Sequence, residues 1–124
     1  LYSNSPYFNK LIENYDELSE FHKEFKQLSR KYLSLASDLE EFKKIVDAIP
    51  LGVSKHFHVI SRSKGTIVVR ARLFCRYLKG SSLRVIYSFI QGKNTIEFIE
   101  LYFKGNKENE DRERIKYYLS NFYR

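Results

Sequence analysis

Arginine side chains that alternate along one stretch of the chain are the residues best suited to chemistry. Arg70, Arg72 and Arg76 share one parity of a predicted strand, and Arg84 lies in the strand that follows. A guanidinium group donates two parallel hydrogen bonds to a phosphate and keeps its charge at physiological pH. Scission of RNA by its own 2′-hydroxyl needs such cations to stabilise the transition state, together with a base and an acid. The arginines therefore favour chemistry on a phosphodiester.

Further polar residues are predicted to join the same face. Glu100, Tyr102 and Lys104 alternate along a third predicted strand. Glu100 can act as the base or form a structural ion pair with an arginine, and both interpretations stay open. The turn at residues 79–82 offers backbone N–H groups to a phosphate. The candidate catalytic residues are Arg84, Lys104, Arg76, Arg72 and Glu100, and the candidate RNA-binding residues are Arg70, Lys79, Ser81, Tyr102 and Lys107.

The charge of the chain is segregated along its length. The net charge is +7, and residues 51–96 carry nine Lys and Arg residues without one acidic residue. Residues 1–50 carry seven basic and nine acidic residues. Charges that serve only solubility are interspersed, so this segregation indicates a surface for a polyanion, in the first place RNA. A solvated basic face without a ligand is the alternative.

The histidines and the cysteine give weaker signals. His56 and His58 are spaced i, i+2 and His22 lies on a predicted helix, but no carboxylate or cysteine at ligand spacing supports a metal site. We therefore expect no metal and no cofactor. Cys75, the only cysteine, is expected to be a small buried hydrophobe. A lone thiol suits a reducing compartment and no apolar run is long enough for a membrane span, so we expect a cytoplasmic protein without a membrane partner.

Helices and strands must together position these residues. Residues 7–14 are predicted to be extended. Apolar residues at spacings of three and four then predict two helices, one capped by Asp16 and one that starts near Ser34 or Ser37 and ends at Pro50. Alternation and turn residues predict strands at residues 67–77, 83–91 and 95–103, some extended structure before them, and a short helix at 108–122.

These elements predict an α+β fold in a single domain, residues 1–124. A helical hairpin packs on a small antiparallel β-sheet, with a short C-terminal helix after it. Covering the arginine face with helices would carry a heavy desolvation cost. We therefore expect that face to be open, while Ile67, Val69 and Leu73 point into the core.

Two segments carry a resemblance to a known family. RLFCRYLKGSSLRVIY at residues 72–87 leads into IEFIELYFKGNK at residues 96–107. The Arg-apolar-apolar-Tyr strand, the basic turn, the short hairpin and the apolar strand ending in a basic residue resemble the core of the RelE/ParE superfamily, the toxins of bacterial toxin–antitoxin systems. The helical hairpin before the sheet occurs in the same order, so the resemblance covers nearly the whole chain.

The resemblance implies a toxin that a partner antitoxin neutralises. In the RelE-like branch it implies metal-independent cleavage of messenger RNA on the ribosome, and hence inhibition of translation. Arg84 and Lys104 fall on the family's phosphate-contacting positions. Basic residues of the preceding strand map approximately to Arg72, Arg76 or Lys79. The chain departs from the family at residues 108–111, Glu-Asn-Glu-Asp, where RelE-like enzymes often place a catalytic tyrosine or histidine.

Three functions remain open on this basis. The cluster of basic residues favours a ribosome-dependent endoribonuclease toxin. The missing C-terminal tyrosine or histidine favours either a ParE-like inhibitor of DNA gyrase or a nucleic-acid-binding module without catalysis. The expected partners are messenger RNA on the ribosome and an antitoxin. We expect the antitoxin to have an acidic, partly disordered segment that wraps the sheet and covers the arginine face.

Overall fold

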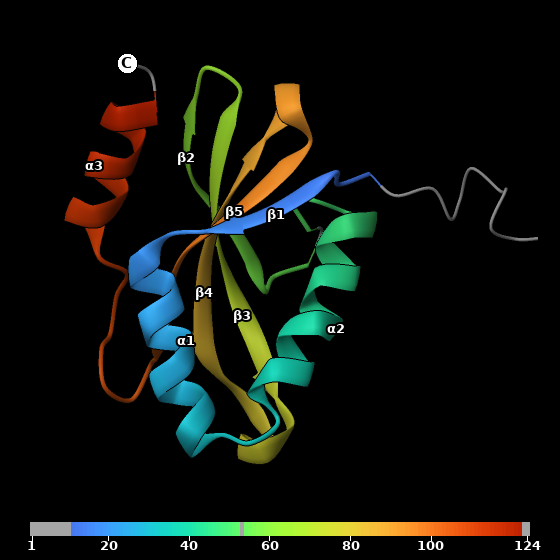
Figure 1. Ribbon diagram of the computed structural model, residues 1–124, viewed down its shortest axis with the longest axis vertical. Helices are drawn as coiled ribbons and strands as arrows, with labels where there is room; N and C mark the ends of the chain where they lie inside the picture. The colour runs from blue at the N-terminus through green and yellow to red at the C-terminus, as the bar shows by residue number, and fades with distance from the viewer. Residues whose placement is uncertain (1–10, 53, 123–124) are drawn as a thin grey trace, which may run out of the picture.

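The computed structural model describes residues 11–52 and 54–122, apart from the side chains of Ser81, Ser82 and Phe122. In chain order the elements are β1 (Asn14–Glu17), α1 (Ser19–Lys31), α2 (Leu35–Ala48), β2 (Phe57–Ser63), β3 (Thr66–Cys75), the 3-10 turn η3 (Arg76–Leu78), β4 (Gly80–Ile90), the 3-10 turn η4 (Gln91–Lys93), β5 (Thr95–Phe103) and α3 (Arg112–Phe122). Figure 1 shows the helical hairpin, the sheet and the C-terminal helix, so the predicted α+β class is confirmed. No helix in the described part of the chain is long and apolar enough to cross a membrane.

The five strands form one mixed sheet in the order β1-β5-β4-β3-β2. The neighbours from β2 to β5 are antiparallel, as predicted, whereas β1 pairs in parallel with β5. Residues 7–10 of the predicted extended segment lie outside the described residues. Asp16 belongs to β1 and Leu18 is the N-cap of α1, so the predicted cap is wrong. The Leu18 N–H donates to the Phe98 carbonyl at 2.9 Å, and the helix begins only after this contact with β5.

Helices α1 and α2 cover one face of the sheet (Figure 1). Their apolar stripes bury Phe21, Leu39 and Phe42 against strand residues, which are of a single parity in β3. From β3 this core receives Ile67, Val69, Ala71, Leu73 and Cys75. The intervening residues of β3 point to the other face because strand side chains alternate. The predicted inward orientation of the apolar residues of β3 is thus confirmed.

The second face of the sheet is partly covered by α3. The cluster beneath this helix consists of Val68, Ile86, Ile99, Tyr102, Ile115 and Tyr118. The Tyr118 hydroxyl donates to Glu97 at 2.7 Å and lies 2.7 Å from the Ser88 hydroxyl. We expected helices on one face only. The apolar residues on the arginine parity of β3 and β4, Val68 and Ile86, explain why α3 packs on this face instead.

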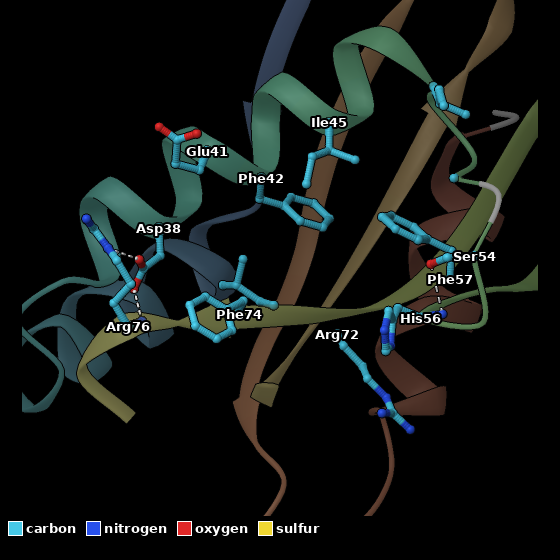
Figure 2. Close-up of a pocket in the computed structure, with 13 residues that line it drawn as sticks. Asp38, Glu41, Phe42, Ile45, Ser54, His56, Phe57, Arg72, Phe74 and Arg76 are labelled. Carbon is cyan, nitrogen blue, oxygen red and sulfur yellow. Dashed lines mark hydrogen bonds and ion pairs between the residues drawn. The ribbon is translucent and has the colours of Figure 1, made fainter. Parts of the chain in front are cut away.

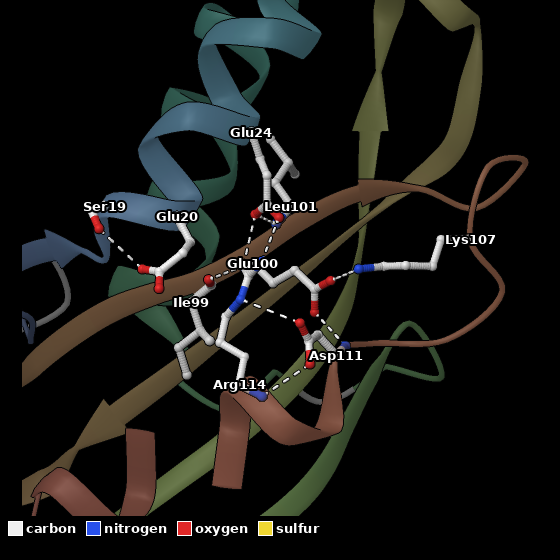
Figure 3. A network of polar contacts seen from close by, with 9 residues as sticks. All are labelled: Ser19, Glu20, Glu24, Ile99, Glu100, Leu101, Lys107, Asp111 and Arg114. Carbon is white, nitrogen blue, oxygen red and sulfur yellow. Dashed lines mark hydrogen bonds and ion pairs between the residues drawn. The ribbon is translucent and has the colours of Figure 1, made fainter. Parts of the chain in front are cut away.

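Polar contacts fasten α3 to β5 and α1 (Figure 3). Arg114 donates to the two carboxylate oxygens of Glu24, at 3.0 and 2.8 Å, and to the Ile99 carbonyl at 2.9 Å. Glu24 also accepts the Leu101 N–H at 3.1 Å. Because β1 pairs with β5 only as far as Phe98, these side chains satisfy backbone groups on the edge of β5 that β1 does not reach. These backbone groups on the edge of β5 are therefore paired without a further strand.

Candidate functional site

A small polar hollow lies on the face of the sheet opposite α1 and α2. Strands β3, β4 and β5 form its floor, and it lies between the start of β2 and the segment that follows β5. Its volume is about 140 Å³, and it is lined by His56, His58, Arg70, Ala71, Arg72, Arg84, Tyr102, Lys104, Glu108 and Asn109. We name it the arginine hollow.

Strand register brings the central residues of the arginine hollow together. Arg72 of β3 lies opposite Arg84 of β4, and Arg84 lies opposite Tyr102 of β5. Directly opposed residues point to the same face, with Cβ atoms about 5 Å apart. Five sequence-predicted site residues therefore lie together: Arg70, Arg72, Arg84, Tyr102 and Lys104.

The arginine hollow holds like charges against one another. Partial burial lowers the pKa of Arg84, and repulsion from Arg72 and Arg70 lowers it further. The Arg84 guanidinium also donates to the Leu83 carbonyl at 3.2 Å, which fixes its direction. Arg72 is exposed. An anion that enters the hollow would relieve the repulsion between these cations, so the electrostatics favour a phosphate there.

Arg70 is the arginine of the hollow with an acidic partner from the C-terminal segment. It donates to Glu110 at 3.1 Å, and the Glu110 side chain is 5% exposed. Burial alone would raise the pKa of Glu110, but its hydrogen bonds and the charge of Arg70 lower it below its usual value. Arg70 therefore anchors the segment between β5 and α3, and it also lines the hollow.

Tyr102 brings a hydroxyl group to the same place. Burial raises the pKa of its phenol, and Glu110 and Glu100 raise it further, while Arg70 and Arg84 act in the opposite direction. The ring packs beneath the Lys107 ammonium, 5.1 Å from its centroid. Tyr102 therefore stays protonated at neutral pH and can donate a hydrogen bond to an anion in the hollow.

Two histidines line the arginine hollow that the sequence did not assign to it. His58 lies opposite Arg70 in the β2–β3 ladder, and the His56 carbonyl accepts the Arg72 N–H at 3.0 Å. Their i, i+2 spacing is the available signal in the sequence, but that spacing alone suggests only a metal site. His22, the third histidine, instead lies 2.7 Å from Glu17, outside the hollow. Among the described residues, no group of three His, Cys, Asp or Glu side chains is placed to hold a metal.

Arg76 does not join the other arginines. Its Nε donates to Asp38 of α2 at 3.1 Å, its backbone N–H donates to the same carboxylate at 3.2 Å, and its guanidinium also contacts Ser37. The β3–β4 register shifts between Leu73 and Cys75, and β3 ends there, so simple alternation no longer predicts where Arg76 points. The expectation that Arg76 lies on the open face was therefore wrong.

Glu100 and Lys107 form a structural pair. The Glu100 side chain is 0% exposed, contacts the Lys107 ammonium and accepts the Asp111 N–H at 2.8 Å (Figure 3). Asp111 in turn accepts the Arg114 N–H at 3.0 Å, at the start of α3. Neither Glu100 nor Lys107 is among the residues that line the hollow. Of the two interpretations left open for Glu100, its position fits the ion pair, and its partner is a lysine.

The turn after β3 is also separate from the arginine hollow. Lys79 is exposed and adopts a left-handed conformation, with φ of 54°, where it ends η3. Ser81 is in β4, but its side chain lies outside the described residues. Neither residue lines the hollow.

No tyrosine of α3 reaches the arginine hollow. Tyr117 is 70% exposed, and Tyr118 is buried among the residues beneath α3. Glu108 and Asn109 do line the hollow, so the segment where the chain departs from the RelE-like pattern borders the site. The segment brings a carboxylate and an amide there instead of a phenol or an imidazole.

A larger, mostly apolar groove runs between α2 and the end of β3 (Figure 2). Its volume is about 730 Å³, and we name it the apolar groove. Ile45 and Phe74 remain 51% and 56% exposed beside it. Arg72 and His56 line both this groove and the arginine hollow, so the two sites are adjacent and share these residues.

Comparison with solved structures shows that the chain has a RelE-like fold. The match is to the archaeal RelE–RelB complex from Pyrococcus horikoshii OT3, with a TM-score of 0.58 over 77% of this chain and 97% of that chain. The sequence identity is 20%, so the match confirms the resemblance at the level of the fold. No family model matches the sequence, and a search of curated proteins gives no match.

Proposed function

We propose that this protein is the toxin of a toxin–antitoxin system and cleaves messenger RNA on the ribosome. The observation that carries the proposal is the arginine hollow, in which Arg72, Arg84 and Lys104 surround a space of about 140 Å³ on a RelE-like fold. The lowered pKa of Arg84, caused by burial and by its arginine neighbours, supports the same conclusion. Clustered cations are unfavourable in the free protein and become favourable once a phosphate lies between them.

The roles of the residues follow from their charge and position. Arg84 and Arg72 contact the non-bridging oxygens of the scissile phosphate and stabilise the charge that develops on them. Lys104 and Arg70 hold the neighbouring backbone. The Tyr102 hydroxyl donates a further hydrogen bond to the phosphate, because its phenol remains protonated. No step of this scheme uses a metal or a cofactor.

The first prediction concerns Arg84. In Arg84→Gln, cleavage of messenger RNA on purified ribosomes, measured by primer extension, should fall on the order of 100-fold. The melting temperature should not fall, because the change removes a charge that its neighbours repel. Arg30→Gln on the exposed side of α1 is the matched control and should cleave normally.

Other outcomes would point to the other functions. If Arg84→Gln cuts at the wild-type rate, the arginine hollow is not the active site. Intact messenger RNA together with loss of DNA supercoiling by purified gyrase would favour a ParE-like inhibitor. Binding of RNA that weakens steeply with salt, without cleavage or gyrase inhibition, would leave a nucleic-acid-binding module.

The proposed partner is an antitoxin with an acidic, amphipathic segment. The apolar groove offers Ile45 and Phe74 to apolar side chains, and Arg72 lies where the groove meets the arginine hollow. A segment that places apolar residues in the groove and carboxylates near Arg72 matches both surfaces in polarity and charge. Such a segment would cover the arginine face directly.

A further inference from the structure

The arginine hollow contains cations for a phosphate, but arginine and lysine are residue types that serve as fixed charges more readily than as proton-transfer groups. Tyr102 is protonated there, since burial raises its pKa, and Glu100 is fully buried behind the hollow. Scission by a 2′-hydroxyl needs one group that accepts a proton and one that donates a proton. Among the lining residues, this leaves the two histidines and Glu108.

The two histidines occupy one wall of the hollow. His58 and Arg70 are directly opposed in the ladder, and His56 lies two residues earlier, joined to Arg72 through its carbonyl. Both imidazoles line the same space as Arg84 and therefore approach whatever phosphate Arg84 holds. They reach it from β2, whereas Lys104 reaches it from the end of β5.

The fold makes little use of these rings. The His56 Nδ1 is buried and has no hydrogen-bond partner within the described part of the chain. An unpaired buried polar atom lowers stability and is uncommon in folded proteins, so it calls for an explanation. His22 differs, since its Nδ1 contacts Glu17 at 2.7 Å. The His56 Nδ1 is thus not explained by structural hydrogen bonding within the described part of the chain.

We propose that His56 and His58 are the proton-transfer groups of the cleavage reaction, an inference that rests on the proposed function. One imidazole, unprotonated, takes the proton of the 2′-hydroxyl. The 2′-oxygen then bonds to phosphorus, the bond from phosphorus to the 5′-oxygen breaks, and the other imidazole, protonated, gives its proton to that oxygen. The products are a 2′,3′-cyclic phosphate and a free 5′-hydroxyl, and no oxidant, reductant or water is consumed. Histidine suits both roles because it titrates near neutral pH.

The test uses the full chain with purified ribosomes carrying a defined messenger RNA. His56→Gln and His58→Gln should each lower the cleavage rate on the order of 100-fold or more. The wild-type rate should depend on pH as a bell-shaped curve. Each variant should lose one limb of that curve, the acidic limb where the base is removed and the alkaline limb where the acid is removed. The 5′ products of the wild type should carry a free hydroxyl, and the 3′ ends a cyclic phosphate.

Controls separate catalysis from folding and from binding. Binding to ribosomes whose messenger RNA has a 2′-O-methyl group at the cleavage site should be unchanged in both variants. His22→Gln, a histidine outside the hollow, should cleave normally. Glu108→Gln tests the competing base and should keep both limbs of the pH curve.

Three outcomes would overturn the inference. If both histidine variants keep the wild-type rate and pH curve while the wild type cuts RNA, the histidine assignment fails and the proposed function stands. If Glu108→Gln alone loses the acidic limb, the base is Glu108 and the assignment of both transfers to histidines is wrong. If the wild type cuts no RNA, the proposed function fails and the assignment fails with it.

Discussion

Asp38 is the acidic residue that holds the end of β3 against α2. Its carboxylate accepts hydrogen bonds from the Ser34 hydroxyl at 2.6 Å and from Arg76 at 3.1 and 3.2 Å, and its side chain is 2% exposed. Burial would raise the pKa of Asp38, but the hydrogen bonds from Ser34, Cys75 and Arg76 lower it below its usual value. The folded protein therefore prefers the charged carboxylate.

Removal of this charge should destabilise the protein. We expect Asp38→Asn to lower the free energy of unfolding by about 2 kcal/mol, because hydrogen bonds to a charged group are lost and Arg76 is left without its partner. Urea unfolding at pH 7 measures the change. Glu41→Gln, on the same helix but exposed and, within the described residues, paired only with Lys44, should change stability little.

The same carboxylate gives a pH dependence with a defined sign. Because the pKa of Asp38 is lower in the folded than in the unfolded chain, its contribution is complete above the ordinary aspartate pKa of about 3.9 and is lost as the pH falls through the folded value. The difference between wild type and Asp38→Asn should therefore shrink below about pH 4. A difference that stays constant with pH would contradict the role given to the charge.

At the scale of elements, one ion pair joins α1 to α3 across the edge of β5. Glu24 and Arg114 are joined by two hydrogen bonds, and both also bind the backbone of β5. The pKa of Arg114 is raised mainly by the hydrogen bond to Glu24, although burial acts against it. Loss of either charge would therefore leave the other poorly compensated in a largely buried position.

Breaking this pair should loosen α3. We expect Glu24→Gln to lower the free energy of unfolding by about 2 kcal/mol, since Arg114 keeps a largely buried charge with only the more distant carboxylate of Asp111, at 3.8 Å, to pair with it. Hydrogen exchange should show faster opening of α3. Glu20→Gln, one turn earlier on α1, is the control because Glu20 is exposed, hydrogen-bonds Ser19 and interacts with Arg114 only through charge, as a lesser influence on the Glu20 pKa. Equal effects of the two changes would argue against the role of the pair.

Most elements could be predicted from the sequence because their periodicity is local. The spacings of Phe21 and Phe42 along their helices, and the alternation of Val69 and Leu73, are set by the core that each residue faces. The parallel pairing of β1 could not be predicted, because it depends on contact with β5 far along the chain. The position of α3 over the arginine-bearing face was missed for the same reason.

The same distinction between local patterns and distant contacts applies to the candidate site. Arg70, Arg72 and Arg84 were predicted to share a face because strand parity is a local property, and they do. Arg76 was misplaced because a register shift near the end of β3 leaves no clear mark in the sequence. His56 was overlooked as a site residue, since only the β2–β3 pairing reveals that it lies beside the arginines.

At the scale of the whole molecule, acidic and basic residues are separated in sequence and partly in space. Residues 51–96, which carry no acidic residue, supply β2, β3 and β4, and these strands contribute most of the lining of the arginine hollow. The acidic side chains that come near it, Glu108 and Glu110, enter from the C-terminal segment. A polyanion therefore meets a surface whose charge is predominantly positive.

The proposed antitoxin site gives a prediction at this scale. Ile45→Lys should weaken binding of the small acidic protein that we expect a neighbouring reading frame to encode, by about tenfold or more, because it places a charge in the apolar groove. Cleavage of RNA should be unchanged, since Ile45 does not line the arginine hollow. Titration calorimetry measures the binding.

Leu33→Lys is the matched control. Leu33 is 75% exposed and lies outside the apolar groove, so this variant should bind the acidic protein normally. Equal binding by Ile45→Lys and the wild type would show that the antitoxin docks elsewhere.

The two sites share Arg72 and His56. This sharing determines how the proposed activity would respond to the amount of antitoxin present. If the proposed antitoxin segment sits in the groove, it occupies side chains that the proposed reaction also needs, so the bound protein would have no partial activity. Inhibition would then depend on the molar ratio of the two proteins: cleavage would stay off while antitoxin is in excess and would begin when toxin exceeds it.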